Sequence, residues 1–174
     1  MRNKLTMILM VGLARSGKST YIKKNNLDAV IVSPDRIRKL IFGHQFHKES
    51  EDFVWAYAKG MARLLLEQSE DVLIDATNLN FQTREQWYNI AKEYSANIRI
   101  IWVKTSLKEC KKRNARGPEN ERLPESVLDG MASIFTNPTE SNNNFDIELI
   151  ETPYKGKHGE CGNIYLDEII ERRK

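Results

Sequence analysis

Cysteine is scarce in this chain of 174 residues, where it occurs only as Cys110 and Cys161. The two residues lie far apart and outside any metal-ligand spacing, so they indicate reduced thiols and, by default, a cytoplasmic setting. The three histidines, His44, His47 and His158, show no ligand pattern either, and we assign them to surface or loop positions. Neither residue type predicts a metal centre.

Long apolar runs are also missing. The run Leu5–Met10 is too short to cross a membrane, so we expect no membrane partner. Arg2 and Lys4 before it resemble the start of a signal peptide. Cleavage nearby would destroy the motif that follows, and we therefore reject that interpretation.

A strong charge of one sign is absent as well, since the net charge is +3 and the isoelectric point is near 8.8. This mildly basic balance fits an anionic substrate without demanding one. A hydrophobic fraction of 40% is enough for a core, and the length favours one domain over residues 1–174. The sequence leaves the oligomeric state open.

What is present is a phosphate-binding loop (P-loop) in "MVGLARSGKST", which begins at Met10. Its residues fit the pattern G-x-x-x-x-G-K-[ST], whose glycines let backbone N–H groups turn toward a phosphate. The lysine can reach the β- and γ-phosphates, and the hydroxyl after it can take Mg²⁺ at the start of a helix. We therefore predict a site for ATP or GTP with Mg²⁺, built from Gly12, Ser16, Gly17, Lys18, Ser19 and Thr20.

Apolar, β-branched runs alternate with amphipathic segments along the rest of the chain. This alternation predicts a three-layer α/β fold with a mostly parallel five-stranded sheet. The expected strands are Leu5–Val11, Ala29–Val32, Asp71–Asp75, Ile98–Val103 and Asp146–Ile150. The expected apolar helix faces are Phe53/Tyr57/Met61/Leu64/Leu65, Trp87/Ile90/Ala91/Tyr94 and Val127/Met131/Ile134.

Ligands in such a sheet bind beyond the carboxyl ends of the strands, so the residues that follow each strand are the candidates for functional roles. After the second strand, Ser33 and Pro34 predict a helix start that places Asp35 and Arg38 on one helical face. These two residues could form an acceptor site, the carboxylate orienting a hydroxyl and the arginine holding an anion. An acid that complements the helix dipole and a solvated arginine are the alternatives.

After the third strand, Asp75 occupies the place of the acid that supports magnesium in P-loop enzymes. A solvated acid at a strand end is the alternative. Thr77 and Asn78 could line the acceptor pocket, and Asn80 predicts the N-cap of the helix that carries Trp87.

An arginine-bearing lid is predicted at about residues 113–123. Arg113 and Arg116 lie three apart at a helix end that Gly117–Pro118 closes, and Arg122 is a weaker candidate. A guanidinium on such a lid can stabilise charge on a transferring phosphoryl group. Simple complementation of the helix dipole is the alternative.

The aromatic residues Phe42, Phe46 and Trp55 fit two roles. They could stack a nucleobase, but packing in the core is the interpretation we favour.

In order along the chain, "GLARSGKST", "SPDRIR", "DATNLN", "TREQW" with Arg84, and "KKRNARG…LPESVLDGM" resemble the phage-type polynucleotide kinases over about residues 5–150. The P-loop alone is common to many nucleotide kinases, whereas the D-x-x-R pair and "TNLN" are more specific. The resemblance implies a P-loop kinase that transfers the γ-phosphate of ATP to the 5′-hydroxyl of DNA or RNA.

The resemblance also implies roles for single residues. Asp35 would be the general base toward the 5′-hydroxyl, and Arg38 would contact the 3′-phosphate of the acceptor's terminal nucleotide. Lys18 would hold the ATP phosphates, and Ser19 would also hold magnesium. Arg116 would be the lid arginine on the phosphates, with Arg113 supporting it.

Three departures from the phage-type pattern stand out. The acid expected directly before "TN" is Ala76 here, and Asp75 takes the earlier place that animal-type members use. The lid run "RNARG" is one residue shorter. The run Phe145–Glu151 lacks the D-x-D-G-T pattern of the phosphatase domain in bifunctional members, so we predict no phosphatase activity. The extension 152–174 has no clear counterpart, although "TPYKGK" stands where related kinases contact adenine.

Alternatives to a polynucleotide kinase stay open at this point. They are a small-molecule or nucleoside kinase, a kinase of charged tRNA, and a nucleotide-binding module without transfer activity. Asp35 argues against the last of these, because a simple binder needs no carboxylate on the acceptor side. The preference between DNA and RNA and the pathway cannot be read from the sequence.

Overall fold

The computed structural model describes residues 4–43, 48–140 and 145–151. The predictions for the three histidines, for Phe46 and for the extension 152–174 lie outside the described residues.

The sheet has five strands in the spatial order β2-β3-β1-β4-β5, and every neighbouring pair is parallel. All five expected strands are confirmed, and among the described residues each neighbouring pair of strands is parallel. Such a sheet is buried on both faces, which is why its strands read as apolar runs without alternation. The strands are β1 (Thr6–Val11), β2 (Val30–Val32), β3 (Val72–Ile74), β4 (Asn97–Lys104) and β5 (Asp146–Glu151).

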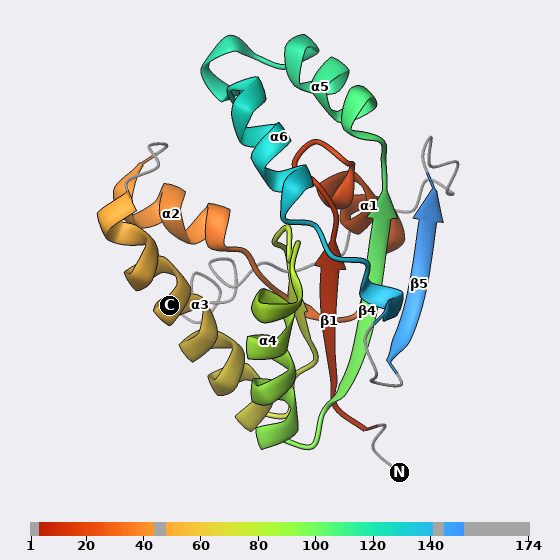
Figure 1. Ribbon diagram of the computed structural model, residues 1–174. Coiled ribbons are helices and arrows are strands. Elements are labelled where there is room, and N and C mark those ends of the chain that lie inside the picture. Colours follow the sequence, from red (N-terminus) through yellow and green to blue (C-terminus); the bar gives the residue numbers. More distant parts are fainter. Residues whose placement is uncertain (1–3, 44–47, 141–144, 152–174) are drawn as a thin grey trace.

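Helices cover both faces of the sheet and its carboxyl end (Figure 1). One layer is formed by α3 (Lys48–Glu67) and α4 (Phe81–Glu93), and α1 (Lys18–Asn25) lies on the opposite face. The pair α5 (Leu107–Arg116) and α6 (Glu125–Ser133) stands above the carboxyl ends of the strands, and α2 (Pro34–Phe42) packs on α3. Short 3₁₀ turns occupy Glu119–Glu121 and Pro138–Glu140. This is the expected three-layer α/β fold.

Successive residues of β1 point to different layers. Met7 and Leu9 belong to the core shared with α3 and α4, whereas Ile8 and Met10 pack with Tyr21 of α1. Each of these side chains is at most 6% exposed. The central strand is thus fixed from both sides, and the P-loop that follows it starts from a rigid base.

The predicted helix starts are confirmed. Ser33 caps α2 by accepting a hydrogen bond from the Arg36 amide at 3.5 Å, with Pro34 at the first helical position. Asn80 caps α4 by accepting from the Thr83 amide at 2.8 Å. The face of α4 that carries Trp87 is buried, as predicted.

The predicted face of α3 is wrong at three of its five positions, whereas Leu65 is buried and Met61 packs against the core as expected. Phe53, Tyr57 and Leu64 are 51%, 38% and 47% exposed. The other buried side chains of the helix are Val54, Ala58, Ala62 and Leu66. Small alanines let the helix approach the sheet closely, a requirement that a hydrophobic pattern weighted toward large side chains does not reveal. The larger aromatic residues therefore face outward.

The predicted face of α6 is wrong for a similar reason. Leu128 is the buried residue of this helix, whereas Val127 and Ile134 are 39% and 51% exposed. The helix rests on α5 above the sheet and not on the sheet itself, so it buries only a narrow strip. Among the described helices, none is long and apolar enough to cross a membrane.

Candidate active site

A cavity of about 850 Å³ opens at the carboxyl end of the sheet. Its walls come from the P-loop, from the segments after β2 and β3, and from α5 with the loop behind it. The residues on which the argument depends are Gly17, Lys18, Ser19, Asp35, Asp75, Thr77 and Arg113. The structure thus brings together the strand-end residues that the sequence marks as functional, at the edge where parallel sheets bind ligands.

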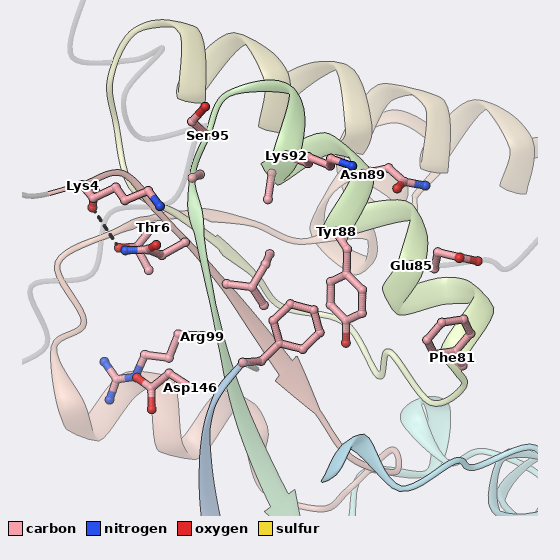
Figure 2. A pocket seen from close by; sticks show the side chains of 15 residues that line it. Lys4, Thr6, Phe81, Glu85, Tyr88, Asn89, Lys92, Ser95, Arg99 and Asp146 are labelled. Carbon is pink, nitrogen blue, oxygen red and sulfur yellow. Dashed lines mark hydrogen bonds and ion pairs between the residues drawn. The ribbon is translucent and has the colours of Figure 1, made fainter. Parts of the chain in front are cut away.

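A second cavity of about 860 Å³ lies at the opposite, amino end of the strands (Figure 2). Of the cations that line it, Arg99 is paired with Glu148 at 2.7 Å, and the ring centroid of Tyr88 lies 4.3 Å from that of Phe145. It contains no P-loop and none of the predicted site residues. Equal volume therefore does not make the two cavities equal candidates.

The P-loop begins at a residue that must be glycine. Gly12 has φ of +148°, and a Cβ atom there would lie 2.7 Å from the Val103 carbonyl oxygen and 2.8 Å from Ser16 Oγ. The Gly12 amide donates to the Thr77 carbonyl at 3.1 Å, which ties the loop to the segment after β3. Gly17, at φ +111°, lets the chain turn from the loop into α1.

Lys18 is the buried cation of the loop. Its side-chain ammonium donates to the carbonyls of Gly12 at 3.0 Å and Leu13 at 2.8 Å, and the residue is 8% exposed. Burial lowers the pKa of Lys18, and the carboxylates of Asp75 and Asp35 partly offset this. The ammonium therefore lines the cavity while bound to the backbone of the P-loop.

Asp75 follows β3 directly, and its amide donates to the Val32 carbonyl at 3.0 Å. Burial raises the pKa of this carboxyl, and Lys18 partly offsets the rise. Ser19, at the start of α1, is exposed and lines the same cavity. Within the described ranges no three His, Cys, Asp or Glu residues form a metal cluster. One hydroxyl and one carboxylate fit Mg²⁺ only as a shared ion, completed by phosphate oxygens and water.

Asp35 and Arg38 meet as their spacing predicts, but they have a third partner. Arg38 Nη1 donates to Asp35 Oδ1 at 2.6 Å. Its Nε and Nη2 atoms bind Glu51 of α3 as a fork, at 2.7 Å and 2.8 Å. Side-chain exposure is 14% for Arg38 and 18% for Glu51 but 90% for Asp35. Glu51 contributes most to raising the pKa of Arg38. The arginine thus joins α3 to an open carboxylate at the cavity.

Asn78 lies outside the cavity lining, and its buried side chain connects β1 to α4. It is 1% exposed at φ +44°, and its Nδ2 donates to the Met10 carbonyl at 2.8 Å. Its Oδ1 accepts from Trp87 Nε1 at 3.1 Å. Arg84, also 1% exposed, donates to the carbonyls of Asn78 and Leu79 at 3.0 Å each. Thr77 lines the cavity and Asn78 does not, so of these two residues Thr77 is the candidate for contact with an acceptor.

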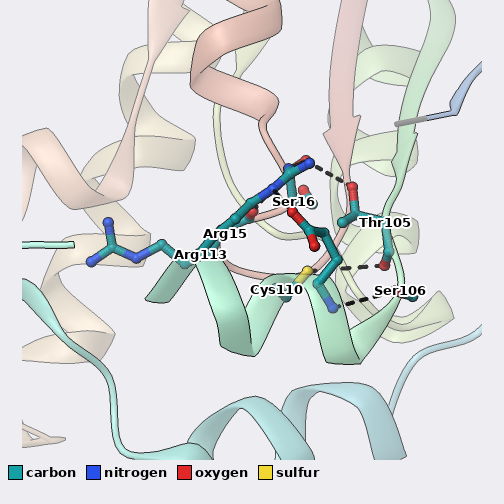
Figure 3. A network of polar contacts seen from close by, with 7 residues as sticks. Arg15, Ser16, Thr105, Ser106, Cys110 and Arg113 are labelled. Carbon is teal, nitrogen blue, oxygen red and sulfur yellow. Dashed lines mark hydrogen bonds and ion pairs between the residues drawn. The ribbon is translucent and has the colours of Figure 1, made fainter. Parts of the chain in front are cut away.

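Arg113 lines the cavity and is anchored to the P-loop (Figure 3). Its Nη1 donates to the Ser16 carbonyl at 2.8 Å, and Glu109 accepts from its Nε at 3.0 Å. Thr105 Oγ1 donates to the same Ser16 carbonyl at 2.8 Å. These two bonds hold the Ser16 carbonyl and so attach the P-loop to α5 and to the segment that leads into it.

One side chain, Asn114, connects the two ends of the predicted lid. Asn114 accepts from the Leu123 amide at 3.0 Å and donates to the Leu123 carbonyl at 2.7 Å. Arg15 of the P-loop reaches across and donates to the Glu121 carbonyl. Arg116, the last residue of α5, is exposed and is not among the residues that line the cavity. Its contact with the ATP phosphates stays a prediction.

Sequence reasoning missed three participants, namely Glu51, Arg15 and Glu121. Arg15 occupies a variable position of the P-loop pattern, and Glu51 stands in the acidic run "KESED", which reads as an ordinary helix start. No spacing rule connects either residue to its partner. Thr20 lines the cavity as predicted, and Ser16 is fully buried.

A family model described as "AAA domain" matches residues 7–138. An L-seryl-tRNA(Sec) kinase of Methanococcus maripaludis is 31% identical over 140 residues, which is 76% of this chain and 53% of that protein. A bifunctional polynucleotide phosphatase/kinase of Schizosaccharomyces pombe is 24% identical over 154 residues, which is 86% of this chain and 34% of that protein. The chain thus spans about half of one relative and a third of the other.

Solved structures share the fold. A chain of the Pnkp1/Rnl/Hen1 RNA repair complex gives a TM-score of 0.67 at 24% identity, covering 76% of this chain and 44% of its own length. The Mycobacterium tuberculosis APS kinase CysC, solved with AMPPNP and APS, gives 0.62 at 16% identity, covering 87% and 91%. These likenesses establish the P-loop kinase fold, and they do not single out the phage-type polynucleotide kinases.

Proposed function

We propose that this chain, which belongs to the AAA domain family, transfers the γ-phosphate of ATP to the 5′-hydroxyl of a polynucleotide. One observation carries the proposal. The open carboxylate of Asp35 lines the cavity of the P-loop and is held in place through Arg38. A module that only binds a nucleotide has no use for an oriented carboxylate beside it, whereas a kinase needs one to orient the acceptor hydroxyl.

On the nucleotide side, Lys18 and the P-loop amides bind the β- and γ-phosphates. Arg113 lines the same cavity and adds a second positive charge for the transferring group. Ser19 and Asp75 would hold Mg²⁺, which would neutralise phosphate charge when bound. Little covalent chemistry is asked of the protein, so positioning and electrostatics supply most of the acceleration.

On the acceptor side, Asp35 orients the hydroxyl for attack along the line of the departing ADP and accepts its proton as the new bond forms. Thr77 lines the wall beside Asp75 and offers a further polar group to the acceptor. Similarity to a polynucleotide phosphatase/kinase and to a chain of an RNA repair complex supports a nucleic-acid end as acceptor.

The test is transfer of labelled γ-phosphate from ATP to an acceptor panel. It contains DNA and RNA oligonucleotides with 5′-hydroxyl ends, nucleosides, nucleoside 3′-phosphates, sugars and a charged tRNA. Asp35→Asn should bind ATP normally and lose transfer, because the amide has nearly the same shape but cannot accept the proton. Asp52→Asn, which changes an exposed acid of α3 outside the cavity, is the matched control. Equal loss of ATP affinity and turnover in Asp35→Asn would contradict the acceptor-side role.

A second candidate is phosphorylation of a hydroxyl carried by the aminoacyl group of a charged tRNA. The observation that favours it is the pairing of Arg38 with two carboxylates, Asp35 and Glu51. Of these three side chains Asp35 is the exposed one, at 90%, and its open carboxylate suits an acceptor whose hydroxyl stands beside an ammonium group. Similarity to an L-seryl-tRNA(Sec) kinase supports the same acceptor. Transfer to seryl-tRNA in preference to a 5′-hydroxyl oligonucleotide would decide for this candidate.

A further inference from the structure

Three aromatic side chains of α2 and α3 stand open to solvent. Phe42, Phe53 and Tyr57 are 38%, 51% and 38% exposed. Phe53 meets Phe42 edge-on with ring centroids 5.9 Å apart, and its centroid lies 6.1 Å from that of Tyr57. By contrast, Trp87 and Tyr88 of α4 are 1% and 9% exposed. A joined group of exposed rings is uncommon on a free surface and indicates a binding surface.

This aromatic surface (Phe42, Phe53 and Tyr57) is continuous with the acceptor side of the cavity. Asp35, Arg38 and Phe42 are spaced i, i+3 and i+7, so they share one face of α2. The fork between Arg38 and Glu51 joins this face to the start of α3, which carries the other two rings. A path therefore runs from the hydroxyl-orienting carboxylate, past the arginine, to the rings.

The length of this path suits a short stretch of nucleic acid. Seven residues of helix separate Asp35 from Phe42, which corresponds to about 10 Å at ~1.5 Å per residue. Stacked nucleotides advance ~3.4 Å each along a strand, so the path spans roughly three of them. A chain end whose hydroxyl lies at Asp35 would present its next bases to the rings.

We propose that the aromatic surface is a stacking platform for the single-stranded nucleotides next to the acceptor hydroxyl. The inference rests on the proposed function for its choice of a nucleic acid as the partner. Aromatic rings stack on any base, so the platform would hold many sequences alike. It would hold an RNA or DNA 5′-end, and equally the single-stranded end of a charged tRNA.

The surrounding charges make stacking the main source of affinity. The exposed cations Lys39 and Lys48 lie within one or two helical turns of the rings along α2 and α3, but so do the exposed acids Glu49 and Asp52. Phosphate attraction is therefore weak, and affinity should fall only slightly with salt, with a log–log slope of about −1 to −2. A strand bound mainly through lysines and arginines would show a much steeper slope.

The experiment measures binding without chemistry. Oligonucleotides that already carry a 5′-phosphate cannot accept a second one there, and their affinity is measured by fluorescence anisotropy for lengths from one nucleotide upward. Affinity should rise with length to about four nucleotides and then level off. Phe53→Ala and Tyr57→Ala should weaken binding of the longer strands by roughly fivefold to a hundredfold, and leave a mononucleotide unaffected. Phe53→Trp should retain binding, and Phe53→Leu should not, because only a ring can stack.

Two variants serve as controls. Leu64→Ala removes another exposed apolar side chain of α3, and Phe81→Ala removes an exposed ring at the amino-end cavity. Neither should change oligonucleotide affinity. Thermal unfolding of every variant checks that the fold persists, which is expected because all the altered side chains are at least 37% exposed.

Wild-type affinity of Phe53→Ala for the longer strands would overturn the platform. If that variant instead turned a dimer into a monomer in sedimentation, the surface would be an interface between copies of the chain. If it sped tryptic cleavage within residues 152–174, the occupant would be the chain's own extension. Transfer to 5′-hydroxyl ends with unchanged affinity in Phe53→Ala would refute the platform alone. Ring-dependent binding without transfer to any nucleic acid would refute the proposed function alone.

Discussion

Replacing Glu51 with glutamine isolates the one contact of the acceptor wall that no motif predicts. The change keeps the size of the side chain and removes its charge. Glu51 accepts from Arg38 through both carboxylate oxygens, at 2.7 Å and 2.8 Å. A glutamine has a single oxygen, so its NH₂ group would face one of the guanidinium donors and repel it.

The expected loss of stability follows from burial. The Arg38 and Glu51 side chains are 14% and 18% exposed, so this pair lies between a surface ion pair and a fully buried one. Surface pairs contribute ~0.2–1 kcal/mol, and breaking a buried pair costs ~3–5 kcal/mol. We expect Glu51→Gln to lower the free energy of unfolding by about 2 kcal/mol, because Arg38 loses the carboxylate that binds it through two atoms.

Although Glu51→Gln should lower stability, it should improve the binding of a phosphorylated acceptor. With one carboxylate removed, the wall around Arg38 becomes more positive by one charge. The KM for a nucleoside 3′-phosphate should therefore fall, by up to about tenfold for ~1.4 kcal/mol of recovered charge-assisted contact. The KM for the bare nucleoside and the KM for ATP should stay the same. A less stable enzyme with a better grip on a phosphorylated acceptor is a result that simple misfolding cannot produce.

The assay combines urea unfolding with steady-state transfer to the two acceptors at fixed salt. Glu93→Gln is the matched control, because Glu93 forms the same kind of fork with Arg63, at 2.8 Å and 3.1 Å, between α3 and α4. That pair is 41% and 46% exposed and is not part of the cavity lining, so neither stability nor acceptor choice should change much. If Glu51→Gln raised both acceptor KM values equally, Glu51 would hold Asp35 in place and would not tune charge.

Four further substitutions test the nucleotide side. Gly12→Ala should abolish ATP binding and destabilise the fold by several kcal/mol, since the added Cβ would lie 2.7 Å from the Val103 carbonyl oxygen; calorimetry measures both effects. Arg113→Ala should raise the KM for ATP roughly tenfold or more. Arg116→Ala should lower kcat alone if its contact with the phosphates forms only in the transition state. Steady-state kinetics of the two variants measures both effects. Because burial raises the pKa of Asp75, magnesium affinity should weaken on acidification at a higher pH than for an ordinary aspartate. Magnesium titrations of Asp75→Asn should show weaker affinity without that pH dependence.

Most of the fold could be predicted from the sequence, because strands and helix starts depend on residues that are close together in the chain. Five apolar runs gave five strands, and Ser33 and Asn80 gave the helix starts, since capping depends on residues three apart. Which faces of α3 and α6 are buried could not be predicted in the same way. Which side of a helix is buried depends on what lies opposite, and on α3 the sheet selects Ala58 and Ala62 over Phe53.

The nucleotide side of the site could likewise be predicted from local sequence, whereas the acceptor side could be predicted only in part. The P-loop needs only its own residues to bind a phosphate, so the glycines and Lys18 could be named from their spacing. On the acceptor side, Asp35 and Arg38 were found as neighbours on one helix. The partner that decides their charge was not, because Glu51 belongs to the next helix.

The sequence by itself determined a phosphate loop after a buried strand, the acids at the ends of β2 and β3, and the order of strands and helices along the chain. Each of these depends on backbone conformation within a few residues. Only the tertiary structure decided that Arg38 is shared between two carboxylates, that Asn78 is a buried clamp, and that the rings of α2 and α3 face outward. Those properties arise from distances between segments far apart in the chain, and such distances are set when the layers pack and not by any local pattern.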